Sequence, residues 1–123
     1  MMRIKMTTET KMNKESILAG KITRSMNFNE KVWALTTQIP RGRVATYGEI
    51  ARRLQSKGYR AVGNALNKNP LAPAVPCHRV VGSDGSLTGF AGGLAKKRQM
   101  LLAEGVALRS GGKVSCSAFY RFD

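Results

Sequence analysis

Residues 46–68, TYGEIARRLQSKGYRAVGNALNK, predict two short helices joined by a tight turn. Thr46, followed three residues later by Glu49, fits a capping box and marks the start of the first helix. We expect this helix to run to about Lys57 and to be stopped by Gly58, and the second to run from residue 59 or 60 to residue 68. The residues expected to pack inward are Ile50, Ala51, Leu54, Val62, Ala65 and Leu66.

A further helix is predicted upstream of this pair. Apolar residues recur at helical spacing from Phe28 to Ile39, Asn27 or Asn29 can cap the start, and Pro40 ends the run. The three helices together fit a helix-turn-helix pattern, although many helical hairpins share that spacing. Residues 1–27 hold many Lys, Thr, Ser and Met without a sustained period, so we expect a flexible basic arm with at most a helical turn around residues 15–18.

Downstream of the pair, residues 77–81 (CHRVV) predict a short extended segment closed by a glycine-containing turn at residues 82–85. A last helix is expected over residues 95–104, with Leu94, Leu101 and Leu102 as core candidates and Gly105 at its end. Residues 118–122 could add a strand or an aromatic plug. The expected fold of residues 28–123 is mainly α: a winged-helix-like helix-turn-helix domain with a short extended segment that carries the candidate active site.

Composition narrows the class of protein. The 123 residues suit one domain, and 42% apolar residues can form a modest core. The formal net charge of +14 favours a polyanionic partner, with nucleic acid first, an anionic membrane surface second, and charge that only confers solubility as the alternative. No apolar stretch approaches the roughly 20 residues that span a bilayer, and the N-terminus lacks a secretory pattern, so we expect a cytoplasmic protein.

A thiol stands beside the only histidine of the chain, at Cys77 and His78. Imidazole can activate a thiol as a nucleophile, but neighbours in an extended segment point to opposite faces, so a bridging water is the simplest connection. The alternatives are a buried structural cysteine and a half-buried, hydrogen-bonded histidine. We expect Cys77 and Cys116 to be reduced, and we expect no metal because Cys77, His78 and Cys116 supply at most three ligands.

Four short runs carry a resemblance to a known family. Residues 69–70 (NP), 75–82 (VPCHRVVG), 89–94 (GFAGGL) and 101–105 (LLAEG) strongly resemble the DNA-binding and active-site domain of the O6-alkylguanine-DNA alkyltransferases, also called methylated-DNA–protein-cysteine methyltransferases. The resemblance covers about residues 28–105. It implies direct DNA repair, in which Cys77 irreversibly accepts the alkyl group from O6 of guanine in duplex DNA, once per molecule and without a cofactor.

The resemblance also implies roles for individual residues. Cys77 matches the nucleophile, His78 its water-mediated base, Glu104 the acid that orients the histidine, and Asn69 the residue that braces the cysteine loop. Tyr47 matches the donor to guanine N3, and Arg60 the finger that fills the stack after the base is rotated out, through the minor groove. The implied DNA-binding residues are Tyr47, Arg60, Ala61, Gly63, Asn64 and Lys68, and the implied base pocket is Tyr47, Leu66, Phe90 and Ala91.

The chain departs from the family pattern in places. The basic arm stands where members commonly carry a domain of ribonuclease-H-like architecture, Phe90 stands where a Tyr is common, and Gln99 replaces an aromatic residue. We expect a monomer, located on the nucleoid or, in a eukaryote, in the nucleus.

Two other functions compete with transfer. One is a non-catalytic, alkyltransferase-like protein that senses the lesion and recruits excision repair; such proteins often have Trp or Ala at the position of Cys77. The other is a generic helix-turn-helix regulator. Without the neighbouring motif, Tyr47, Arg60 and Glu104 would be read as ordinary helix and surface residues.

Overall fold

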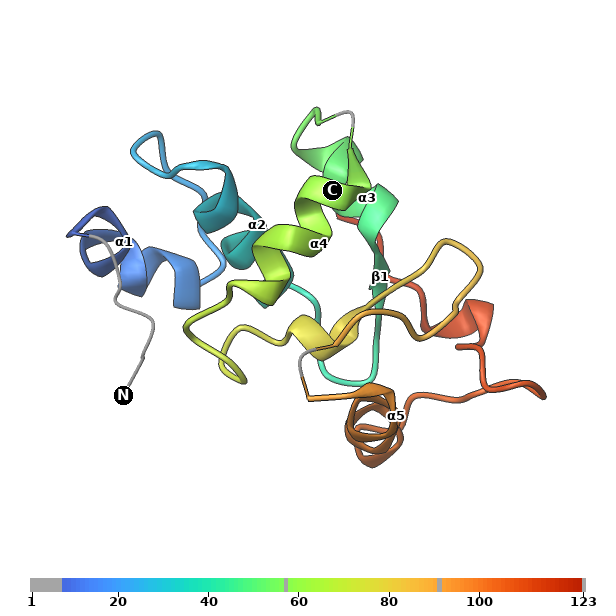
Figure 1. Cartoon of the computed structure of the whole chain (residues 1–123). Helices are drawn as coiled ribbons and strands as arrows, with labels where there is room; N and C mark the ends of the chain where they lie inside the picture. Colours follow the sequence, from blue (N-terminus) through green and yellow to red (C-terminus); the bar gives the residue numbers. More distant parts are fainter. Residues whose placement is uncertain (1–7, 57, 91, 123) are drawn as a thin grey trace.

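The computed structural model describes residues 8–56, 58–90 and 92–122 (Figure 1). In chain order, these residues form α1 (Thr8–Leu18), α2 (Phe28–Thr37), β1 (Ala45–Thr46), α3 (Tyr47–Arg53), α4 (Tyr59–Asn67), a 3-10 turn (Cys77–Arg79), β2 (Val80–Val81), α5 (Leu94–Ala103) and a second 3-10 turn (Cys116–Ala118). The expectation of a mainly α fold is confirmed. Within the described residues no helix is long and apolar enough to cross a membrane.

Helix α2 begins where its capping residue predicts. The backbone N–H of Glu30 donates to the Asn27 side chain at 2.9 Å, and the Glu30 carboxylate accepts from the Asn27 backbone N–H at 3.0 Å. This reciprocal pair satisfies two of the backbone donors that a helix start leaves free. The indole of Trp33 then donates to the carbonyl of Ala65 at 2.8 Å, which fixes α2 against α4.

The helix-turn-helix pair is present as α3 and α4, with one boundary corrected. Thr46 caps α3, because its hydroxyl accepts from the Glu49 N–H at 2.9 Å. The Glu49 carboxylate, however, turns outward to Arg52, and α3 ends at Arg53, short of the expected end near Lys57, which itself lies outside the described residues. Gln55, with φ of 54°, makes the left-handed turn, so Gly58 does not stop α3 but caps the start of α4 in an extended conformation.

The two short strands pair the residues that follow the candidate active-site turn with the residues that precede α3. β1 and β2 pair in parallel, with Ala45 opposite Val80 and Thr46 opposite Val81. The expected extended conformation is therefore right for Val80 and Val81 but wrong for Cys77 to Arg79, which form a 3-10 turn. The backbone N–H of Arg79 donates to the Pro76 carbonyl at 2.9 Å and closes this turn.

Helix α5 lies apart from the other helices in Figure 1 and packs against the Cys77–Arg79 turn. Leu101 is buried as expected, but Leu94 and Leu102 are 49% and 46% exposed, so their assignment to the core is wrong. The buried row of α5 is Lys97 and Leu101, which lie four residues apart on one helical face. A residue next to Leu101 in sequence is rotated by about 100° away from that face, which explains the exposure of Leu102.

The N-terminal region is structured from Thr8 onward. Helix α1 packs on α2, and both Ile17, fully buried, and Met26 belong to the main hydrophobic cluster. The Gln38 side chain donates to the Gly20 carbonyl at 2.7 Å and secures the connection between the two helices. The expectation of a flexible arm is therefore wrong for residues 13–26, because Ile17 and Met26 bury apolar surface against α2; residues 1–7 lie outside the described residues.

The C-terminal segment acts as an aromatic plug and also makes a strand-like contact. Phe122 is buried in the main cluster, and Tyr120 stacks edge-on against it with ring centroids 5.2 Å apart. The backbone of Val44 donates to Ala118 at 2.9 Å and accepts from Tyr120 at 2.7 Å. A second, smaller cluster that includes Val44, Val81 and Leu101 joins this tail to α5.

Candidate functional site

The candidate nucleophile begins the 3-10 turn that precedes β2. Cys77 is half-buried and packs against the main cluster, so it is neither a fully buried structural cysteine nor a freely exposed one. Cys116 is exposed on the second 3-10 turn, and both cysteines carry free thiols. β2 pairs in parallel with β1, so the Cys77 turn, which precedes β2, lies at the end of the sheet where Val44 precedes β1. A negative charge on Cys77 still acts on Tyr47, the first residue of α3.

The side chain of His78 points away from solvent toward the end of α5. It is 3% exposed, and its Nε2 lies 3.0 Å from Oε2 of Glu104. Arg79 also binds Glu104, with its Nε donating to Oε1 at 2.9 Å and its second terminal nitrogen donating to Oε2 at 2.8 Å. The tertiary structure thus brings together His78 and Glu104, as the resemblance implied, and adds Arg79, which the sequence analysis did not single out.

Burial controls the charge of this cluster. It lowers the pKa of His78 below its ordinary value, because removal from water disfavours the imidazolium; Glu104 opposes this effect and Arg79 and Lys97 reinforce it. Burial acts to raise the pKa of Glu104, but the hydrogen bonds from Arg79 and His78 outweigh it, and the pKa is lowered. At neutral pH the site therefore contains a neutral imidazole beside an ionised carboxylate.

Asn69 braces the loop that leads to Cys77. Its amide Nδ2 donates to the carbonyl of Val75 at 3.0 Å, and its Oδ1 accepts from the N–H of Leu71 at 2.8 Å. Val75 is fully buried two residues before the thiol, so this pair of bonds fixes the approach of the chain to the turn. The bracing role that the resemblance implies for Asn69 in the reaction stays a prediction.

Lys97 on α5 is fully buried. The Nζ of Lys97 donates to the carbonyl oxygens of Val80 at 2.6 Å and Thr88 at 2.7 Å, and it lies 5.8 Å from the centre of the Tyr47 ring. Burial lowers the pKa of Lys97 to about 8, and a negative charge on Cys77 acts in the opposite direction. Sequence analysis missed Lys97, because a lysine in a basic helix is normally solvated; its only signal was the four-residue spacing to Leu101.

Tyr47 shares the Thr88 carbonyl with Lys97 and also lines an open groove. Its hydroxyl donates to the Thr88 carbonyl at 3.1 Å, and burial raises the pKa of the phenol. The groove runs between the α3 and α4 starts and residues 82–89. Its lining includes four of the expected DNA-binding residues, Tyr47, Arg60, Gly63 and Asn64. Tyr59, 67% exposed, also lines the groove and was not expected there.

The remaining expected residues lie elsewhere. Ala61 on α4 and Lys68, the residue after α4, are exposed but do not line the groove. Leu66 is buried in the main cluster rather than in a base pocket. Phe90 is half-buried and lies so close to Gly92 that an added Cβ there would stand 3.0 Å from its ring. Ala91 lies outside the described residues. The structure therefore gathers Tyr47, Arg60, Gly63 and Asn64 at one groove but does not place Leu66 or Phe90 in its lining.

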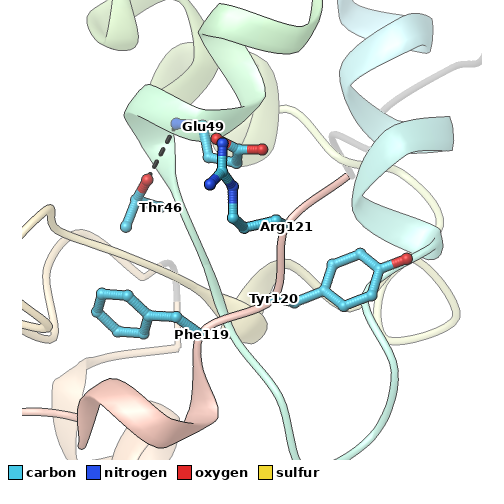
Figure 2. Close-up of a pocket in the computed structure, with 5 residues that line it drawn as sticks. All are labelled: Thr46, Glu49, Phe119, Tyr120 and Arg121. Carbon is cyan, nitrogen blue, oxygen red and sulfur yellow. Dashed lines mark hydrogen bonds between the residues drawn. The ribbon is translucent and has the colours of Figure 1, made fainter. Parts of the chain in front are cut away.

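A second, smaller pocket lies on the other side of α3, where the C-terminal segment passes (Figure 2). Figure 2 shows Arg121 pointing toward Glu49, and the positive charge of Arg121 contributes to lowering the Glu49 pKa, after the larger effect of Arg52. The Glu49 carboxylate also accepts from the Phe122 N–H at 3.3 Å. This pocket thus marks a contact that holds α3 to the tail rather than a part of the cysteine site.

The fold and the site together define a helix-turn-helix domain with a single half-buried cysteine beside a histidine–carboxylate–arginine cluster. The chain belongs to the 6-O-methylguanine DNA methyltransferase family, whose DNA-binding-domain model matches residues 27–106. This match spans the helix-turn-helix pair, the Cys77 turn, α5 and Glu104.

Similar proteins agree with this assignment. The methylated-DNA–protein-cysteine methyltransferase of Methanosarcina mazei is 54% identical over 78 residues, which are 63% of this chain and 49% of that protein. Its counterpart in Mycobacterium tuberculosis H37Rv is 46% identical over 82 residues, which are 66% of this chain and 50% of that protein. The chain therefore spans about half the length of the curated relatives that it matches.

Solved structures show the same fold. Mycobacterium tuberculosis OGT in complex with DNA is 38% identical with a TM-score of 0.62, and the match covers 79% of this chain and 66% of that one. S. pombe Atl1, in complex with damaged DNA containing O6-carboxymethylguanine, is 31% identical with a TM-score of 0.66. The Atl1 match covers 77% of this chain and 95% of that protein.

Proposed function

We propose that this protein repairs DNA directly by irreversible transfer of the alkyl group from O6-alkylguanine to Cys77, as a self-inactivating methylated-DNA–protein-cysteine methyltransferase. The observation that carries the proposal is the half-buried Cys77 thiol, which directly precedes an imidazole that lies 3.0 Å from Glu104. A charge on Cys77 acts on Tyr47, which lines the groove at the helix-turn-helix pair. Membership of the alkyltransferase family supports the same reaction.

The chemistry follows from this arrangement. His78 uses Nε2 toward Glu104, so its other ring nitrogen, Nδ1, accepts the Cys77 proton directly or through a water. The thiolate then attacks the alkyl carbon, a carbon–sulfur bond forms as the carbon–oxygen bond breaks, and the electron pair stays on O6 of guanine. A proton returns to the purine, for which the Tyr47 hydroxyl is the proposed donor at N3. The products are unmodified guanine and an S-alkylcysteine, so the protein reacts once.

The proposed partner is duplex DNA, approached from its minor groove. Tyr47, Arg60, Gly63 and Asn64 line one open groove, and Gly63 allows close approach because it carries no side chain. The target atom lies inside the base stack, so the nucleotide has to be rotated out at a cost of a few kcal/mol. Arg60, exposed at the start of α4, fills the vacated position in this proposal. The OGT and Atl1 complexes with DNA support this use of the fold.

Lesion sensing without transfer is the alternative that the Atl1 likeness raises, because the match covers almost all of that protein. The thiol at position 77 favours transfer. We further propose that the protein acts as a monomer in the compartment that holds the DNA, the cytoplasmic nucleoid or the nucleus. Its formal net charge of +14 supports attraction to DNA and opposes self-association.

Mass spectrometry after incubation with a duplex that contains O6-methylguanine tests the proposal. We expect the peptide with Cys77 to gain one methyl group and the duplex to regain guanine. Cys77→Ser should bind the duplex without a mass change, whereas Cys116→Ser should still accept the methyl group, because Cys116 lies exposed on a separate turn. Tight binding by the unsubstituted protein with no mass gain would reject transfer and leave lesion sensing.

A further inference from the structure

The side chain of Arg79 ties three separate parts of the chain together. It binds both oxygens of Glu104, at 2.9 Å and 2.8 Å, and its remaining terminal nitrogen donates to the carbonyl of Ile39 at 2.7 Å. The Arg79 side chain is 16% exposed and the Glu104 side chain 10%, so the ion pair is largely shielded from water. Such a two-point contact holds the plane of the carboxylate as well as its position.

The same carboxylate oxygen also serves His78. Oε2 of Glu104 lies 2.8 Å from the Arg79 nitrogen and 3.0 Å from Nε2 of His78. A carboxylate without a cation would draw a second proton onto the imidazole, because an ion pair satisfies a buried negative charge better than a neutral donor does. Arg79 already supplies that positive charge. The imidazole therefore needs only to donate one hydrogen bond to Glu104.

We propose that Arg79 is a positioning residue for the transfer reaction: by neutralising Glu104 it keeps His78 uncharged, with its proton on Nε2 and with Nδ1 free to accept the proton of Cys77. This inference rests on the proposed alkyl transfer for its functional meaning. The arrangement of charge that it describes belongs to the protein itself and can be measured without a substrate.

The groups around the ring are consistent with this role. Glu104, at the end of α5, favours the charged ring, whereas Arg79 on the same turn and Lys97 within α5 both disfavour it, and burial of the ring acts in the same direction as the two cations. In the proposed reaction the ring takes the proton of Cys77, the preceding residue. Loss of the Arg79 charge would therefore raise the pKa of His78 and leave a fraction of the molecules without a usable base.

The test uses the fact that His78 is the only histidine, so its ring signals in an NMR titration are unambiguous. Arg79→Gln removes the charge but can still donate to Ile39 or Glu104, whereas Arg79→Lys keeps the charge without the two-point geometry. We expect Arg79→Gln to shift the His78 titration upward by about one pH unit. Arg79→Lys should shift it by much less. Lys113→Met, which removes a cation from the exposed pair with Asp84, should leave it unchanged.

A second measurement needs no variant. The nitrogen chemical shifts of the unsubstituted protein at about pH 7.5 should show a neutral ring protonated on Nε2. A charged ring, or a proton on Nδ1, would overturn the inference, and so would equal titration shifts in folded Arg79→Gln and Arg79→Lys, which indicate a purely structural role. Failure of alkyl transfer with the expected His78 titration would instead reject the proposed function. Where transfer occurs, its rate should fall at low pH as His78 gains a proton. In Arg79→Gln the pH of this fall should move upward together with the His78 titration.

Discussion

The ammonium of Lys97 lies 5.8 Å from the centre of the Tyr47 ring, and both side chains donate to one acceptor, the carbonyl oxygen of Thr88. Tyr47 begins α3 at the proposed DNA groove, whereas Lys97 lies within α5 behind the cysteine turn. Thr88 belongs to the loop between β2 and α5 and also lines the groove. One buried cation therefore couples the position of this loop to both helices.

Lys97 should make stability depend on pH in the alkaline range. The folded protein releases its proton near pH 8, whereas the unfolded chain holds it to about 10.5. Between these values the unfolded chain binds more protons, so the free energy of unfolding rises with pH. The test compares Cys77→Ser with Cys77→Ser/Lys97→Met by denaturant unfolding. Between about pH 7.5 and pH 9.5, the free energy of unfolding of the variant that keeps Lys97 should rise by about 1–2 kcal/mol relative to the other. Parallel pH dependences would contradict the burial of the ammonium.

Asn69→Ala should lower both stability and the rate of transfer. It removes the bonds to the Val75 carbonyl and the Leu71 N–H, and we expect a loss of about 1–3 kcal/mol in the free energy of unfolding because these groups are partly buried. The matched control is Gln99→Ala, an exposed side-chain amide on α5 away from the groove, which should change stability by less than about 0.5 kcal/mol. Equal stabilities of the two variants in urea would show that Asn69 does not brace the loop.

Arg60→Ala should weaken repair of duplex DNA far more than reaction with free O6-methylguanine base, because only the duplex requires a residue to fill the vacated stack. Arg60 is exposed and lines the groove, and the control Arg24→Ala removes another exposed positive charge, before α2. Transfer rates on the two substrates, measured at two salt concentrations, separate a specific loss from a general loss of charge. Equal losses on duplex and free base would remove Arg60 from its proposed role.

Ile17→Ala tests whether the N-terminal helix is part of the folded domain. Ile17 is fully buried between α1 and the main cluster, so truncation should cost about 2–5 kcal/mol in the free energy of unfolding. Leu18→Ala, at a neighbouring side chain that is 37% exposed, should cost less than about 1.5 kcal/mol. Thermal unfolding followed by the single tryptophan, Trp33 on α2, reports this packing. A Tm unchanged by Ile17→Ala would show that α1 does not stabilise the domain.

Sequence analysis placed the helices well where local signals were strong. Thr46 caps α3 as predicted, and Asn27, one of the two residues offered for α2, caps that helix, because a cap depends only on residues within one helical turn. The prediction of a short extended segment was wrong at Cys77, His78 and Arg79. The backbone hydrogen bonds that close this turn could not be inferred from residue type. The same limit applied to α5, whose leucines suggested a buried face that packing assigned instead to Lys97 and Leu101.

The candidate site divides in the same way. The Pro76–Val80 run and Glu104 could be recognised from their resemblance to a family, and the structure brings His78 and Glu104 into contact across 26 residues of sequence. The sequence analysis predicted no role for Arg79 or Lys97, because arginine and lysine are common in a chain with 21 of them and most are solvated. In the structure Lys97 is fully buried and the Arg79 side chain is 16% exposed.

The sequence by itself determined the helix starts, the excess of positive charge and the presence of one thiol beside one imidazole, since each depends on residue type and short-range spacing. The tertiary structure alone decided which cations are removed from water and which carboxylate or carbonyl oxygens they bind. Arg79 and Lys97 acquire their roles because parallel pairing of β1 with β2 and packing of α5 on the cysteine turn enclose them with Glu104 and Thr88. The energy of a charge depends on its surroundings, and distant parts of the chain supply those surroundings.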